Sequence, residues 1–255
     1  TVMALTRVTK TGNITVDGDI GIGVVPGEWS VNYPAFQIGQ GGTFTGHRNN
    51  TQTQLGQNWW VGTGNQYVVN GAASRMVMNP DSTIIFSQAP SGTAGATMST
   101  THNRLVIDTS GRVTMPYQPA FWATSTSSNV NISSTAATNF NVTRVNVGNH
   151  YNTSNKRFTA PVSGTYYFEC VIQSHGASSA HQHALGVGLL KNGNSFKDQY
   201  HGSGGATNYI TVNCNAMIYL NQSDFVTSQI QPGISIDIEY SGGIDRCHFS
   251  GYLIG

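Results

Sequence analysis

Two pairs of acidic residues stand two positions apart on strand-like segments, Asp17 with Asp19 and Asp237 with Glu239. Because alternate residues of a strand point to the same face, each pair can present two carboxylates side by side. A glycosidase needs two carboxyl groups across a cleft, one of them in a setting that raises its pKa. The sequence shows no such setting and contains no GxSxG, HExxH, Walker or dinucleotide-binding motif. We interpret the acidic pairs as solvated strand faces or turn residues, and we expect no enzymatic activity.

The segment His181-Gln-His183 has the spacing of a metal-binding pair. In a strand, two imidazoles at this spacing point the same way, and three copies around a threefold axis would offer six nitrogens. Such a donor set suits a transition metal such as iron or nickel. The alternative, which we favour, is a polar loop that leads into an apolar strand at residues 184–190. No other cofactor is predicted.

The tryptophans offer flat surfaces on which a sugar ring can stack. In the adjacent pair Trp59 and Trp60, strand alternation would bury one ring and expose the other, which indicates an interface or ligand role for one of them. Trp29 and Trp122 are interpreted as core or interface residues, as tryptophans more often are.

Three polar, glycine-rich segments in the second half, residues 175–182, 198–208 and 241–246, are predicted to be loops. Loops on a rigid sheet scaffold are where binding sites usually lie. Tyr200, His201 and Arg246 are the side chains in these segments best suited to contact a ligand. The residues do not specify which ligand that would be.

The composition predicts an all-β protein. Charged residues make up only 9% of the chain, while turn-forming and strand-forming residues are abundant and the residues of long helices are scarce. With a net charge of +1 and no basic run, nucleic acid is not an expected partner. No apolar stretch is long enough to span a membrane as a helix. For Cys170, Cys214 and Cys247 we favour free, buried thiols over one bridge with a leftover thiol.

Two halves with different patterns of strand-like segments meet near residues 116–119. We expect three parts: residues 1–24 as a β-rich shaft or attachment segment, 25–116 as a β-rich N-terminal domain, and 117–255 as a sandwich of short strands. The segments 14–22 and 105–113 each contain two strand-like runs around an Asp/Gly turn, which is typical of a hairpin. In the second half, strands are predicted at 140–147, 164–172, 184–190, 209–220, 225–230, 234–240 and 247–254.

The second half resembles the C1q globular-head family, a branch of the tumour-necrosis-factor-like jelly-rolls. The family signature of spaced aromatic residues followed by Gly-x-Tyr-x-Phe falls on Phe140, Asn146, Tyr151, Phe158, Gly164, Tyr166 and Phe168, with Cys170 where a further aromatic is usual. Other family-like segments are 119–121, 158–161, 190–193, 220–226 and 249–253. The resemblance implies an antiparallel jelly-roll that trimerises and binds ligands. The acidic calcium ligands of the family cannot be matched residue by residue, so calcium is not carried over.

The first half resembles, more loosely, the shaft and collar segments of phage tail fibres, on the phrases at 18–23 and 107–113. That resemblance implies a homotrimer and fits a metal held on an HxH motif. The expected function is a homotrimeric viral (phage) surface fibre or spike whose head binds a host-surface glycan or protein noncovalently, with other virion proteins contacting the N-terminal half. The expected location is the virion surface, outside the cell. The alternatives are a capsid decoration or cement trimer and a secreted C1q-like lectin.

Overall fold

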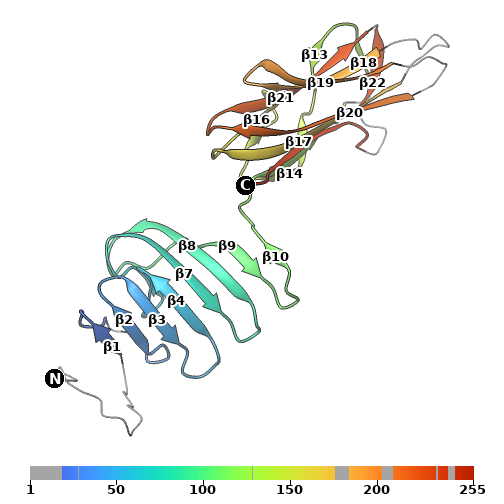
Figure 1. Ribbon diagram of the computed structural model, residues 1–255. Helices are drawn as coiled ribbons and strands as arrows, with labels where there is room; N and C mark the ends of the chain where they lie inside the picture. The colour runs from blue at the N-terminus through green and yellow to red at the C-terminus, as the bar shows by residue number, and fades with distance from the viewer. Residues whose placement is uncertain are drawn as a thin grey trace. The chain divides into compact units, whose positions relative to one another are not determined.

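The computed structural model describes residues 19–27, 29–127, 129–175, 184–202, 209–233, 235–240 and 245–255. These residues form strands and turns, and no helix occurs among them, so none that could cross a membrane is found there. The all-β fold predicted from the composition is confirmed. The chain divides into two compact units, Thr1–Pro116 and Tyr117–Gly255, here called the N-terminal unit and the head (Figure 1).

One sheet of eight strands forms most of the described N-terminal unit. In spatial order it contains β1 (Ile20–Ile22), β2 (Ala35–Ile38), β3 (Gly42–Gly46), β4 (Thr53–Gln57), β7 (Gly71–Met78), β8 (Ile84–Gly92), β9 (His102–Ile107) and β10 (Val113–Thr114). β1 and β2 are parallel, and the other neighbours are antiparallel. β5 (Trp60–Val61) and β6 (Asn65–Gln66) form a separate short hairpin. Because β1 pairs with β2, the sheet crosses the division expected at residue 24.

A small core lies on one face of this sheet. Trp29, Trp59 and Tyr67 reach it from the loops and pack on the small side chains Ala35, Ala73 and Ala89 of the strands. The Tyr67 hydroxyl donates to the carbonyl oxygen of Pro90 at 2.6 Å, which satisfies its polar end. The N-terminal unit therefore has a hydrophobic cluster of its own.

The N-terminal unit differs from the sequence prediction in detail. The hairpin predicted at 105–113 is confirmed by β9 and β10, whereas residues 14–18 of the other predicted hairpin lie outside the described residues. The strands at 35–57 were not predicted. Their buried positions are mostly polar and several of their large apolar side chains are exposed, so the hydrophobic pattern does not match the burial pattern.

The head consists of two antiparallel sheets. The first contains β12 (Asn129–Ile132), β22 (Ile236–Glu239), β17 (Gly164–His175), β23 (His248–Leu253), β11 (Ala120–Thr124) and β14 (Val142–Val147), with β20 (Tyr209–Leu220) beside β17. The second contains β15 (Tyr151–Asn152), β16 (Arg157–Thr159), β21 (Phe225–Pro232), β18 (Ala184–Lys191) and β19 (Asn194–Gly202), with β13 (Ala136–Ala137) beside β21. The sheets form two layers (Figure 1), and their facing side chains enclose one core. The predicted sandwich is confirmed.

An aromatic stack forms the centre of that core. Phe121 lies 4.9 Å from Tyr151, 5.0 Å from Phe158 and 4.9 Å from Phe249 between ring centroids. Tyr166 and Phe168 complete the cluster, which buries all of these rings. Leu253 is partly buried and packs against the cluster.

The three cysteines are free and buried in the head, as predicted. Cys170 and Cys214 are direct partners on β17 and β20. Burial raises the thiol pKa of Cys170 and raises that of Cys247 to about 11. The thiols are therefore protonated at neutral pH and unreactive.

Candidate functional site

The outer side of the first head sheet carries large side chains that point away from the core. We call the set Trp122, Val145, Tyr167, Met217, Tyr219 and Tyr252 the aromatic face. Strand alternation places them there, because their neighbours Phe121, Tyr166, Phe168 and Ile218 are fully or almost fully buried in the core. Met217 is 69% exposed and Tyr219 is 57% exposed.

Strand register makes the aromatic face continuous. Tyr252, Tyr167 and Met217 are consecutive partners across β23, β17 and β20, and the rings of Tyr167 and Tyr252 lie 5.5 Å apart. Trp122 and Val145 are partners on β11 and β14. The result is an exposed patch that crosses five neighbouring strands of one sheet.

The charged groups of this region are partnered within the head, including Glu169, which lies on the same outer side of β17 as Tyr167 and accepts a hydrogen bond from Asn213 at 2.7 Å. Arg144 makes two hydrogen bonds to the carboxylate of Asp245, at 2.9 and 3.1 Å, and these hold the pKa of Asp245 below its usual range. His248 lies 4.9 Å from Trp122 and 3.9 Å from Glu169, and burial lowers its pKa. The six side chains of the aromatic face are themselves uncharged, and their exposed apolar area suits contact with another protein surface rather than solvent.

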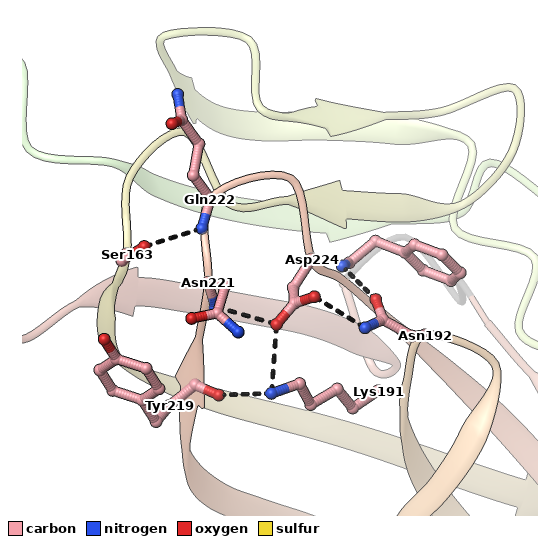
Figure 2. Close-up of polar contacts among 8 residues, drawn as sticks. Ser163, Lys191, Asn192, Tyr219, Asn221, Gln222 and Asp224 are labelled. Atoms are coloured by element: carbon pink, nitrogen blue, oxygen red, sulfur yellow. Dashed lines mark hydrogen bonds and ion pairs between the residues drawn. The ribbon is translucent and has the colours of Figure 1, made fainter.

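At one end of the head, Asp224 ties the turn between β18 and β19 to the turn between β20 and β21 (Figure 2). Its carboxylate accepts hydrogen bonds from Asn192 at 2.8 Å and from the backbone N–H of Asn221 at 2.9 Å, and it pairs with the Lys191 ammonium at 3.2 Å. Lys191 also donates to the carbonyl oxygen of Tyr219. These contacts lower the pKa of Asp224. Because both carboxylate oxygens are engaged, Asp224 acts as a structural clamp.

Tyr200 and His201 were predicted on a loop, but they lie on β19. The sequence prediction missed this strand, because the exposed residues of β19 are too polar to show a clear alternation. Both side chains are exposed, and the Tyr200 hydroxyl contacts the Gln231 side chain on β21. The rest of the segment, residues 203–208, lies outside the described residues.

Arg246 stands just before β23 and is engaged within the head. Its guanidinium donates to Gln173 at 3.0 Å, lies 3.6 Å from the Glu239 carboxylate and sits 5.9 Å from the ring of Tyr209. Tyr200 belongs to the other sheet. Arg246 therefore supports the end of β17 and β22 and is not part of a cluster with β19.

Trp59 is a core residue of the N-terminal unit, contrary to a ligand role. It is 1% exposed, its Nε1 donates to Asn65 at 3.0 Å, and the Arg75 guanidinium covers its ring at 4.3 Å. Trp60 is partly buried, lies 6.5 Å from Trp29 and lines a hollow of about 290 Å³. Of the two, only Trp60 retains an accessible surface.

Among the residues that the structure describes, the remaining chemical candidates do not come together in a site. His181 and His183 lie outside the described residues, and the described residues contain no group of three or more metal-ligating side chains. Asp237 accepts a hydrogen bond from Asn131, and Glu239 pairs with Arg246. Asp19 accepts one from the backbone of Ala35, and Asp17 is outside the described residues. Each described carboxylate of the two acidic pairs is thus engaged locally.

Two antiparallel sheets packed around an aromatic core, with an apolar outer face on one of them, define the head as a β-sandwich of the jelly-roll class. The family model of the C1q domain matches residues 120–254. The chain belongs to the C1q domain family.

A human protein named complement C1q tumor necrosis factor-related protein 5 is 32% identical over 140 residues, which cover 55% of this chain and 55% of that protein. The chain thus spans about half the length of this curated relative. Among solved structures, the globular domain of zebrafish complement 1qA is 20% identical, with 54% of this chain and 98% of that one covered and a TM-score of 0.38. The Eiger TNF from S. frugiperda is 12% identical, with 55% and 94% covered and a TM-score of 0.45.

Proposed function

We propose that this chain is the subunit of a non-enzymatic homotrimer whose heads bind a surface receptor. The aromatic face carries the proposal. Its side chains include three tyrosines and a tryptophan, residue types that each bury about 150–250 Å² when covered. A patch of that size on a lone domain marks an interaction surface. Packing three heads around an axis would cover it, and closed symmetry would leave no face for further growth.

Receptor contact is proposed on the exposed strand β19 rather than on the aromatic face. Tyr200 and His201 project from it into solvent. A tyrosine gives a large contact area with little conformational entropy to lose, and a neighbouring imidazole adds a hydrogen-bonding group. Three copies of a weak site on one trimer gain avidity for a surface that repeats its ligand. A host-surface glycan meets that requirement.

We place this trimer on a virion, as a tail fibre or receptor-binding spike, with the N-terminal unit contacting other virion proteins. The fibre-like phrases at 18–23 and 107–113 and the very low charge support this setting. The second candidate is an extracellular C1q-like lectin. Its support is the similarity of the head to the human C1q tumour-necrosis-factor-related protein. Both candidates use the same head and differ in the structure that carries it.

Binding of the purified chain to an array of host-surface glycans tests recognition. Tyr200→Ala and His201→Ala should each weaken binding, whereas Phe196→Ala, an exposed aromatic on the same strand, is the matched control. If Tyr200→Ala and His201→Ala bound the array as strongly as the control Phe196→Ala, β19 would be excluded from the receptor site. Electron microscopy with an antibody against this chain tests the setting. Label at virion tails supports a fibre, and label over the capsid shell supports a decoration protein instead.

A further inference from the structure

The N-terminal sheet places polar side chains on its covered face. Gln37, Thr43, Thr45, Gln54 and Ser87 are almost fully buried beneath the loops of the unit. The opposite face exposes large apolar side chains instead, including Phe44 at 49% and Leu55 at 45%. An antiparallel sheet with one solvated face normally does the reverse. The exposed face of this sheet is therefore built for burial.

Register shows how continuous that face is. One row of directly paired residues crosses seven strands, in the order Ile20, Phe36, Phe44, Leu55, Met76, Phe86 and Leu105. A second row continues it on the later strands with Met78, Ile84, Ile107 and Val113. We call these two rows the apolar rows. At the usual strand spacing, the first row is about 29 Å long.

The apolar face is hollowed at its centre. A depression of about 550 Å³ is lined by Ile38, Phe44, Leu55 and Phe86, among others. Neither apolar row contains a charged residue. Two arginines also line the depression. Arg75 is bonded within the unit, to Gln54 at 2.9 Å and over the Trp59 ring, and Arg104 donates to Gln88 at 3.1 Å. A partner for this face needs apolar surface of matching extent.

We infer that this face packs against the same face of the other copies of this chain in the trimer. The first row, on strands of about five residues, covers about 500 Å² in projection before side-chain relief is counted. That is the scale of the roughly 800 Å² that each partner gives to a standard interface. The apolar rows carry no charge that would repel the same rows of another copy, and three N-terminal units joined to one trimer of heads are held at high effective concentration.

The inference rests on the proposed homotrimer, and it adds that the N-terminal units take part in it directly. Hydroxyl-radical footprinting of the purified full-length chain compares two phenylalanines of nearly equal exposure in the single chain. Phe44 is 49% exposed on the apolar face, and Phe196 is 50% exposed on β19 of the head. We expect severalfold slower labelling of Phe44. Equal labelling in a trimer of full mass would overturn the inference and leave the proposed function standing.

Two variants identify what covers the face. Leu55→Asp places a charge at its centre, and it should raise Phe44 labelling to the level of Phe196 while the heads keep the trimer mass. Leu55→Cys with a short bis-maleimide should give covalent dimers of the chain on a denaturing gel, and Gln57→Cys at the end of the same strand should give fewer. The native cysteines are buried and provide little background. If Phe44 is protected from labelling but no cross-linked dimer forms, the face is covered by other residues of the same chain, and the inference is overturned. A wild-type monomer would overturn both the inference and the proposed trimer.

Discussion

Phe121→Ala should destabilise the head strongly, because Phe121 is the hub of its core. The ring contacts three others at centroid distances of 4.9–5.0 Å and a fourth, Phe168, at 6.3 Å. Truncating a buried phenylalanine costs about 3–5 kcal/mol, and losing four ring contacts places this site in the upper part of that range. Against a typical total stability of about 5–15 kcal/mol, this loss removes between about a third and nearly all of the stability of the head.

We would measure thermal unfolding of the full-length protein by calorimetry. The protomer concentration is held fixed, because assembly shifts the apparent stability. At about 3 °C per kcal/mol, the head transition should fall by roughly 10–15 °C. Phe196→Ala is the matched control, since it removes the same side chain from an exposed position. If Phe121→Ala shifted the transition no more than Phe196→Ala, the aromatic stack would not be the centre of stability.

Three further predictions concern single positions in the head. A Cβ on Gly251 would lie 2.6 Å from the Phe168 ring and 2.8 Å from the Tyr167 carbonyl oxygen. Gly251→Ala should therefore lower the free energy of unfolding, measured by denaturant titration, by about 1–3 kcal/mol. A decrease as small as that caused by Ser250→Ala would contradict the close packing at Gly251. Asp224 has a lowered pKa, so its stabilisation is complete above the unfolded value of about 3.9 and is lost as pH falls through the lower folded value. Asp224→Asn should accordingly lower the melting temperature at neutral pH more than in acid, and an equal loss at both would refute the clamp. Met217→Glu should dissociate the trimer without unfolding the head, as seen by light scattering and circular dichroism, and an unchanged mass would exclude Met217 from the interface.

The head could be predicted from the sequence because its core follows strand alternation. Tyr166 and Phe168 share one side of β17, and Phe249 and Gly251 share one side of β23, so apolar spacing and burial agree. β19 escaped prediction because its exposed positions are mostly polar, and its hydrogen bonds to β18 are not visible in its own residues. Pairing between distant segments, rather than local pattern, makes it a strand.

The N-terminal unit was harder to predict for the opposite reason. In β3 and β4, Thr43 and Gln54 are buried while Phe44 and Leu55 are exposed, so hydrophobicity predicts the wrong inner face. Strand alternation correctly predicted that one ring of the Trp59–Trp60 pair would be buried. The Arg75 guanidinium that covers the Trp59 ring comes from a different strand, so no pattern near Trp59 predicts that contact. Viewed as a single chain, this sheet breaks the usual rule that the apolar face is buried and the polar face is exposed. The rule would be restored if other copies of the chain cover the apolar face.

We propose that three copies of the chain assemble through the aromatic face. Light scattering coupled to size-exclusion chromatography measures this directly on the purified full-length protein at micromolar concentration. The account predicts one species with three times the 27.2 kDa mass of the chain, stable on dilution because the covered faces are apolar. A folded species that stays at 27.2 kDa over that concentration range would contradict it.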